Sequence, residues 1–191
     1  MLSLCVLTWY IGTNVPQLVN HMRFCVPSVI AALLPLWSIA AMPNPPATQM
    51  RTFHLDAPLA RVFPLFTANG ERAWAPGWEP RILSGAEDRG SAFITTAHDG
   101  ALVTWIVTDY RPAQGHVSYA RLVRDSNIGL VDVACTEARG GTDVSVRYTL
   151  TAVSAAGESF VAQFLKDEHY TKMIEEWQAA TREALRLPAT P

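Results

Sequence analysis

Only a few residues in this chain have a type and a sequence setting that could support chemistry, and His98 is the first of them. It ends a predicted strand and precedes Asp99-Gly100, which is a turn signal. An imidazole at such a position can act as a general base or hydrogen-bond a ligand carbonyl. A solvated histidine at a strand end has the same signature, so both interpretations stay open.

Tyr148 is the second candidate, because the alternation of its strand turns it inward. Val144, Val146 and Leu150 share its face, whereas the residues between them are polar. A buried tyrosine hydroxyl can move a proton, and it can equally belong to a core residue that bonds the backbone. His98 and Tyr148 are therefore the two catalytic candidates.

Other chemical signatures are missing from the sequence. It contains no Gly-rich phosphate loop, no nucleophile elbow, and no HExxH or CxxC spacing, so we expect neither a metal ion nor a cofactor. Of the cysteines, only Cys135 lies in the part with regular periodicity, and no disulfide is expected there. The 15 Lys and Arg residues are dispersed among 17 Asp and Glu residues, which gives no basic stripe for nucleic acid.

The most distinctive segment is the loop at residues 70–80, which carries two tryptophans among prolines and glycines. Pro76 and Gly77 interrupt helix and strand continuity between Trp74 and Trp78. Large apolar rings in such a loop either plug the end of a hydrophobic core or roof a cavity. The loop alone leaves both alternatives open.

A regular pattern of strands surrounds this loop. Phe53 and Leu55 alternate with polar residues in a first strand at residues 51–56, and a short helix broken at Pro64 follows it. Turn signals then separate further strands at residues 81–84, 91–98, 102–110, 116–124, 127–137 and 142–152. Because their connections are short, neighbouring strands must be antiparallel, which predicts a meander.

Alternation also assigns faces on the central strands. Trp105 is expected to point inward, whereas Tyr110 on the same strand belongs to the outer face. The phase of the next strand is ambiguous, because Tyr119 and Arg121 share a face. An inward Arg121 would need a carboxylate partner such as an acidic ligand, so we expect Arg121 on the outer face.

The last element is a helix over residues 158–187 with two apolar stripes. Phe160 and Phe164 lie on one side at about 100° per residue, and the stripe that contains Trp177 lies on another. One straight helix cannot bury both stripes, so we predict a break near residues 167–169. The order of elements predicts an α+β fold in which a curved antiparallel sheet wraps around the C-terminal helix and leaves an apolar cavity.

The N-terminal 41 residues do not have the pattern of a domain. Residues 1–41 contain one formally charged residue, Arg23, and the second of their apolar stretches has the basic start and small-residue end of a secretory signal. If this segment is translated, it exports the protein or anchors it to a membrane. If the start is over-extended, Met42 or Met50 begins a cytoplasmic protein. Residues 42–49 are predicted to be a Pro-rich linker.

Several segments together resemble bacterial members of the SRPBCC superfamily, from a branch without characterised function. The residues that carry the resemblance are 62–67, 71–80, 95–98, 141–148 and 174–177. The superfamily includes polyketide cyclases, lipid-transfer START domains and the birch-pollen allergen type. The resemblance covers residues 50–187 and implies a helix-grip domain with an internal apolar cavity, but it carries no shared catalytic motif.

What the resemblance implies about function is a cavity that takes a small hydrophobic or aromatic molecule. The ligand-binding side chains would then be aromatic, namely Trp74, Trp78, Trp105, Tyr119, Tyr148 and Trp177. The absence of an evident nucleophile favours a binding protein. A polyketide cyclase/dehydratase-like enzyme without metal, in which His98 or Tyr148 moves a proton, is the alternative. An interaction module without ligand is a third.

Overall fold

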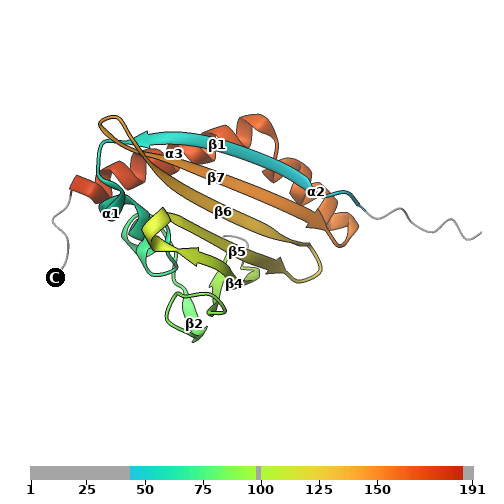
Figure 1. The fold of residues 1–191 in the computed structure, drawn as a ribbon. Helices are drawn as coiled ribbons and strands as arrows, with labels where there is room; N and C mark the ends of the chain where they lie inside the picture. Colours follow the sequence, from blue (N-terminus) through green and yellow to red (C-terminus); the bar gives the residue numbers. More distant parts are fainter. Residues whose placement is uncertain (1–43, 98–99, 187–191) are drawn as a thin grey trace, which may run out of the picture. The chain divides into compact units, whose positions relative to one another are not determined.

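The computed structural model of the chain describes residues 44–97 and 100–186, which form one antiparallel sheet and a set of helices (Figure 1). In chain order the elements are β1 (Ala47–Leu55), α1 (Leu59–Val62), the 3-10 turns η1 (Phe63–Phe66) and η2 (Gly70–Ala73), β2 (Arg81–Ser84), β3 (Ala92–Thr96), β4 (Leu102–Arg111), the 3-10 turn η3 (Pro112–Gln114), β5 (His116–Val123), β6 (Asn127–Ala138), β7 (Gly141–Ala152), α2 (Ala155–Phe164) and α3 (Asp167–Arg186).

The seven strands lie in the order β1-β7-β6-β5-β4-β3-β2, and every neighbouring pair is antiparallel. The strands from β2 to β7 follow one another through short turns, so the predicted meander is confirmed. The first strand completes the sheet from the other end, because β1 pairs with β7 and places Phe53 opposite Val144. This pairing places the first strand of the chain beside the last one.

The first strand is longer than the sequence indicated. β1 begins at Ala47, so the last residues of the predicted linker at 42–49 belong to the sheet. They are strand because Ala47, Thr48 and Gln49 find partners along β7. The signal, anchor or over-extended start predicted for residues 1–41 lies outside the described residues. Within the described ranges, no helix is both long and apolar enough to cross a membrane.

An irregularity in β4 corrects one predicted face. The register between β4 and β5 shifts between Val107 and Asp109, so that one residue of β4 bulges out of the ladder. Beyond the bulge, Tyr110 pairs with the buried Val117 and its ring contacts Phe63, with centroids 5.9 Å apart. Tyr110 therefore faces inward, contrary to the prediction from uninterrupted alternation.

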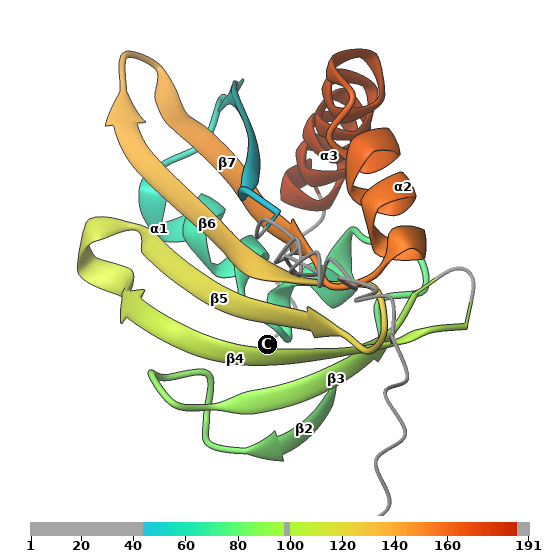
Figure 2. The ribbon, with the colours of Figure 1, turned by 90° about the vertical axis from the view of Figure 1, so that its right-hand side faces the viewer.

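The C-terminal helices lie on the concave side of the sheet, which curves around them (Figure 2). The predicted interruption is confirmed within two residues, since α2 ends at Phe164 and α3 begins at Asp167. Tyr170 fixes α3 to the sheet from its first turn, because its buried hydroxyl donates a hydrogen bond to the carbonyl oxygen of Val146, 3.0 Å away. The predicted α+β helix-grip architecture is confirmed.

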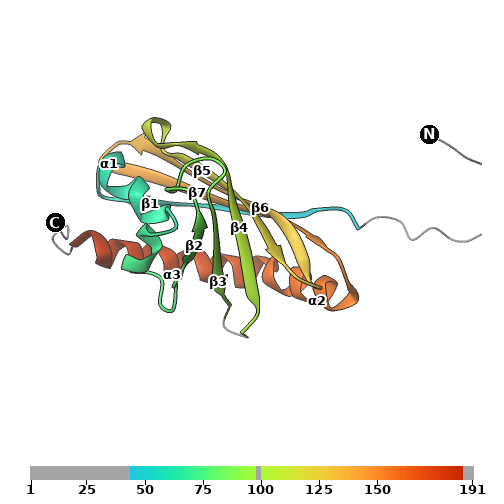
Figure 3. The same ribbon diagram turned by 90° about the horizontal axis from the view of Figure 1, so that it is seen from below.

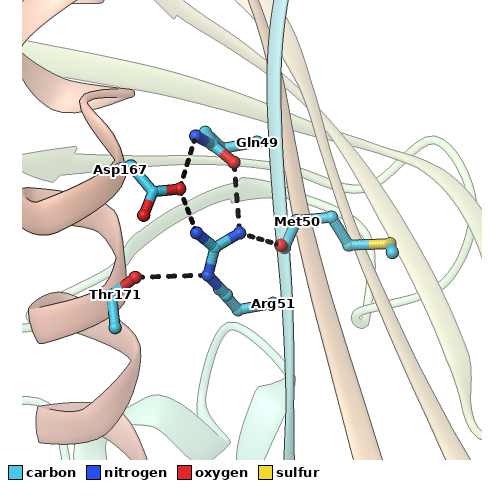
Figure 4. A network of polar contacts seen from close by, with 5 residues as sticks. All are labelled: Gln49, Met50, Arg51, Asp167 and Thr171. Atoms are coloured by element: carbon cyan, nitrogen blue, oxygen red, sulfur yellow. Dashed lines mark hydrogen bonds and ion pairs between the residues drawn. The ribbon is translucent and has the colours of Figure 1, made fainter.

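A polar network joins the same helix to the first strand. The Arg51 guanidinium on β1 pairs with the Asp167 carboxylate and donates a hydrogen bond to the Thr171 hydroxyl at 3.2 Å (Figure 4). Gln49 and the Met50 carbonyl oxygen also accept hydrogen bonds from this guanidinium. The network attaches the start of α3 to β1, which forms one edge of the sheet.

The two shorter helices lie toward opposite ends of α3 (Figures 1 and 3). At one end, Arg61 of α1 donates a hydrogen bond to the Leu185 carbonyl oxygen near the end of α3, at 2.5 Å. At the other end, Ser154 caps α2 by accepting a hydrogen bond from the Gly157 N–H at 3.0 Å. The helices thus line the concave face from one end to the other.

Gly157 sets how closely α2 approaches the turn between β5 and β6. A Cβ atom at this position would lie 1.8 Å from the Ser126 carbonyl oxygen, which is far inside van der Waals contact. We therefore expect Gly157→Ala to displace α2 and to lower the free energy of unfolding by at least about 2 kcal/mol, measured by urea titration of the full chain.

A control on the same helix separates this clash from a change in helix propensity. Ser159 is exposed, and Ser159→Ala should change the free energy of unfolding by less than about 0.5 kcal/mol. Equal stability of the Gly157→Ala protein and the unmodified protein would show that α2 does not need this close approach.

Candidate functional site

A cavity of about 760 Å³ lies between the concave face of the sheet, the α2–α3 pair and the loop after η2. Its size falls within the range of sites for small organic ligands. All of the aromatic residues predicted to bind ligand line it, namely Trp74, Trp78, Trp105, Tyr119, Tyr148 and Trp177. The structure therefore gathers on one surface side chains from five separate parts of the chain.

The broken first helix provides the polar contacts that orient three of these rings. The predicted break at Pro64 divides the segment into α1 and η1, and the carbonyl groups at the end of such a short element lack helical partners. These carbonyls accept hydrogen bonds from the side chains that surround the cavity: Trp74 Nε1 to Leu65 O (2.6 Å), Tyr119 Oη to Phe66 O (2.9 Å) and Trp78 Nε1 to Ala68 O (2.7 Å).

Trp74 combines the two roles that the sequence left open for the loop. Its side chain is 7% exposed and packs edge-on against Trp177, with ring centroids 5.1 Å apart, so it belongs to the core. Trp78 is only half-buried, and its ring meets Trp105 at 5.7 Å. Both tryptophans border the cavity, so plugging the core and walling the cavity are not exclusive here.

Trp105 points inward as predicted. Its indole N–H donates a hydrogen bond to the Thr95 hydroxyl on β3 at 2.9 Å, and its ring stacks on Phe93 with an interplanar angle of 7°. Because the polar atom of the indole is satisfied by the neighbouring strand, the ring offers the cavity an apolar surface. Tyr119 completes this group with its ring nearly perpendicular to Trp105.

Tyr148 faces the cavity from β7, and the inward face predicted for this strand is confirmed by the burial of Val144, Val146 and Leu150. Its ring belongs to the buried core and packs against Phe164 and Tyr170, whereas its hydroxyl forms no hydrogen bond with any described residue. Burial raises the pKa of Tyr148, and nearby Arg121 partly opposes this effect. The hydroxyl therefore stays protonated, and the residue borders the cavity.

Arg121 corrects the second prediction made from alternation. Its side chain is 8% exposed and lines the cavity instead of the outer face. The guanidinium donates a hydrogen bond to the Asn127 side-chain oxygen and lies between the rings of Trp105 and Phe160, 5.7 and 5.8 Å from their centroids. A neutral amide and two aromatic faces thus hold this cation inside, and they were not visible in the strand pattern.

Glu71 is a cavity residue that the sequence analysis did not single out. It lies in η2, and its side chain borders the cavity together with the aromatic groups. Burial raises the pKa of Glu71 well above its ordinary value. Its position three residues before Trp74 was the available signal, because an ionised carboxyl group among large apolar rings is costly unless it is paired.

Charged side chains also mark the rim of the cavity on α3. His169, Lys172 and Glu176 are exposed and border the opening, and the last two lie 3.9 Å apart as an ion pair. His98, the other catalytic candidate, lies outside the described residues. In the part of the chain that the structure describes, no cluster of His, Cys, Asp and Glu side chains is arranged to hold a metal ion.

The raised pKa of Glu71 has a consequence for stability. Folding favours the protonated carboxyl, so the contribution of Glu71 to the free energy of unfolding is complete below the pKa that Glu71 has in the unfolded chain. This contribution is lost as the pH rises through the pKa that Glu71 has in the folded chain. Glutamine cannot ionise. We expect Glu71→Gln to gain stability relative to the unmodified protein as the pH rises above about 4.3, the ordinary pKa of a glutamate, in urea titrations at each pH.

Glu175→Gln is the matched control, because Glu175 is exposed on α3 and should show no such pH-dependent difference. If the Glu71→Gln and Glu175→Gln proteins follow the same pH profile, the Glu71 carboxyl is solvated like a surface group.

The fold is similar to that of solved structures with low sequence identity. Norcoclaurine synthase from Thalictrum flavum superimposes with a TM-score of 0.57 at 8% identity, over 76% of this chain and 89% of that one. Ara h 8.0201 gives 0.55 at 18% identity, over 73% and 95%. An uncharacterised protein from Rhizobium leguminosarum gives 0.54 at 17% identity, over 74% and 95%. At these identities, the likeness shows the fold alone.

No curated protein sequence matches the chain. A family model does match, over residues 47–180, and it describes polyketide cyclases, dehydrases and lipid transport proteins. The matched region contains the whole sheet, α2 and most of α3. Because this match spans most of the sequence, the chain belongs to the polyketide cyclase / dehydrase and lipid transport family, within the SRPBCC superfamily.

Proposed function

We propose that this chain binds a small hydrophobic, aromatic molecule in the cavity enclosed by the sheet and α3. The observation that carries the proposal is the character of the wall: about 760 Å³ of space is bordered by aromatic rings. The indole N–H groups of Trp74, Trp78 and Trp105 donate to the protein itself, so these rings present apolar surface to an occupant. Flat rings around an apolar space favour a flat ligand.

Family membership supports the same proposal in general terms. The family description joins enzymes that act on small molecules with lipid transport, and both activities need an enclosed apolar site. A module that only contacts other proteins would gain stability by filling its interior with side chains, because empty volume is costly. The size of the cavity therefore argues against the ligand-free alternative.

A cyclase-like or dehydratase-like enzyme is the second candidate, and a specific observation favours it. Tyr148 and Glu71, which both carry exchangeable protons, border the same apolar space. Such groups can exchange protons with a substrate that the cavity wall holds in a reactive conformation. Within this proposal, the aromatic wall orients the substrate and no metal participates.

The first experiment is mass spectrometry of small molecules extracted from the full chain after native purification. We expect an aromatic or otherwise hydrophobic compound in stoichiometric amount. The matched preparation is the Val131→Trp protein, because Val131 lies on the cavity wall between Tyr119 and Tyr148 in the sheet register. Loss of the compound from this preparation would place it in the cavity.

The same substitution predicts a measurable change in affinity for a defined probe. Calorimetric titration with 2-ethylnaphthalene should show binding to the unmodified chain and at least roughly tenfold weaker binding to Val131→Trp, because the added indole occupies ligand space. Leu130→Trp is the control, since Leu130 is the exposed neighbour on the opposite face of β6.

Two results would count against the proposal. Equal weakening by both substitutions would indicate a general effect on the sheet, and undiminished binding to Val131→Trp would place the probe outside the cavity.

A further inference from the structure

We propose that Glu71 is the polar anchor of the cavity and selects aromatic ligands that carry a hydrogen-bond acceptor oxygen, such as the oxygen of an aryl ketone. The neutral carboxyl donates its proton in a hydrogen bond to this oxygen. This inference rests on the proposed function and adds to it the chemical class of the ligand.

The backbone around Glu71 is held firmly, so the carboxyl extends from a defined position. The Thr67 hydroxyl accepts a hydrogen bond from the Gly70 N–H at 3.1 Å and donates one to the Pro64 carbonyl oxygen at 3.1 Å. A Cβ atom on Gly70 would lie 1.8 Å from the same Pro64 oxygen, so only glycine lets η2 approach η1 this closely. The N–H of Glu71 itself donates to the Thr67 carbonyl oxygen at 3.1 Å.

The protein supplies no partner for the side chain that this backbone positions. Among the described residues, no hydrogen bond or ion pair reaches the Glu71 carboxyl group, and its half-buried side chain borders the cavity. An ionised carboxylate against apolar walls is unfavourable, so desolvation shifts the group toward its protonated form. A protonated carboxyl group is a hydrogen-bond donor, and its natural partner is a neutral acceptor oxygen.

Other titratable groups around the cavity act differently from Glu71. Tyr119 is tied to the Phe66 carbonyl oxygen, and the Glu87 carboxylate accepts a hydrogen bond from the Asn69 N–H beside η2 at 2.6 Å. The remaining charged or titratable groups that border the cavity with Glu71 are Arg121 on β5, Tyr148 on β7, and His169, Lys172 and Glu176 on α3. The groups on α3 are exposed at the rim, so the interior donors that an acceptor oxygen can reach are on Glu71, Tyr148 and Arg121.

The raised pKa of Glu71 supports this arrangement and gives the proposal a pH dependence. Donation requires the protonated form, which exists below the folded pKa and disappears as the pH rises through it. Selection for the acceptor oxygen must therefore weaken with rising pH. An ionised carboxylate would instead repel a ketone oxygen and favour a cationic amine.

Two probes of nearly equal shape test the proposal on the full chain. They are 2-acetylnaphthalene, which carries a ketone oxygen, and 2-ethylnaphthalene, which does not. The readout is the ratio of their dissociation constants by calorimetry, since hydrophobicity alone already separates the two probes. We expect Glu71→Leu to shift this ratio by roughly tenfold against the ketone, which is the contribution of about one buried hydrogen bond.

Conservative and control variants make the result specific. Glu71→Gln keeps a donor, so it should hold the ratio within roughly threefold of the unmodified value and remove its pH dependence. Glu175→Leu removes an exposed carboxylate on α3 that lies outside the cavity lining, and it should leave the ratio unchanged. If Glu71→Leu fails to fold, the ratio of dissociation constants can still be measured over a pH series for the unmodified chain and for Glu71→Gln. The anchor requires a pH-dependent ratio in the first protein and a constant ratio in the second.

The outcomes separate this inference from the proposed function. If both probes bind and their ratio is the same in the unmodified, Glu71→Gln and Glu71→Leu proteins, the anchor is wrong while aromatic binding stands. A ratio that moves toward the ketone as the pH rises also overturns the anchor. If neither probe binds, the proposed function fails, and the anchor fails with it.

Discussion

The hydrogen bonds to the carbonyl groups that follow the broken first helix are the constraint on which the cavity depends. A helix that continued through this segment would have used these carbonyls internally, but η1 ends at Phe66 and Thr67 is extended, which leaves them free for side chains. Trp74, Trp78 and Tyr119 donate to them from the loop and from β5. One short segment thereby fixes the orientation of three rings and satisfies their polar atoms.

The space itself exists because the C-terminal helices cannot pack fully against the curved sheet. Tyr170 and Arg51 fix the start of α3 against β7 and β1, on one side of the sheet. α2 lies at the β5–β6 turn, where Gly157 permits contact with Ser126. Between these attachment points the sheet curves away, and aromatic side chains border the remaining volume without filling it.

Local periodicity predicted the elements well, because alternation and turn signals act within a few residues. It gave the antiparallel meander, the break before α3 and the inward face of Tyr148. It failed where a distant contact decides the outcome. Tyr110 turned inward because of a bulge in the β4–β5 ladder, and Arg121 is buried because Asn127 and two aromatic rings from other elements receive its guanidinium. Neither cause can be read from the sequence of the strand that it affects.

Glu71 shows most clearly what the fold alone does not explain. The other polar atoms of the wall discussed above have protein partners: Trp105 has Thr95, and Tyr119 has Phe66. Within the described part of the chain, the Glu71 carboxyl and the Tyr148 hydroxyl form no hydrogen bond with the protein, yet both border the same cavity. A leucine and a phenylalanine there would spare the cost of burying these groups. Under the function proposed above, the polarity at these two positions serves an occupant of the cavity and discriminates among aromatic molecules that the rings alone would accept equally.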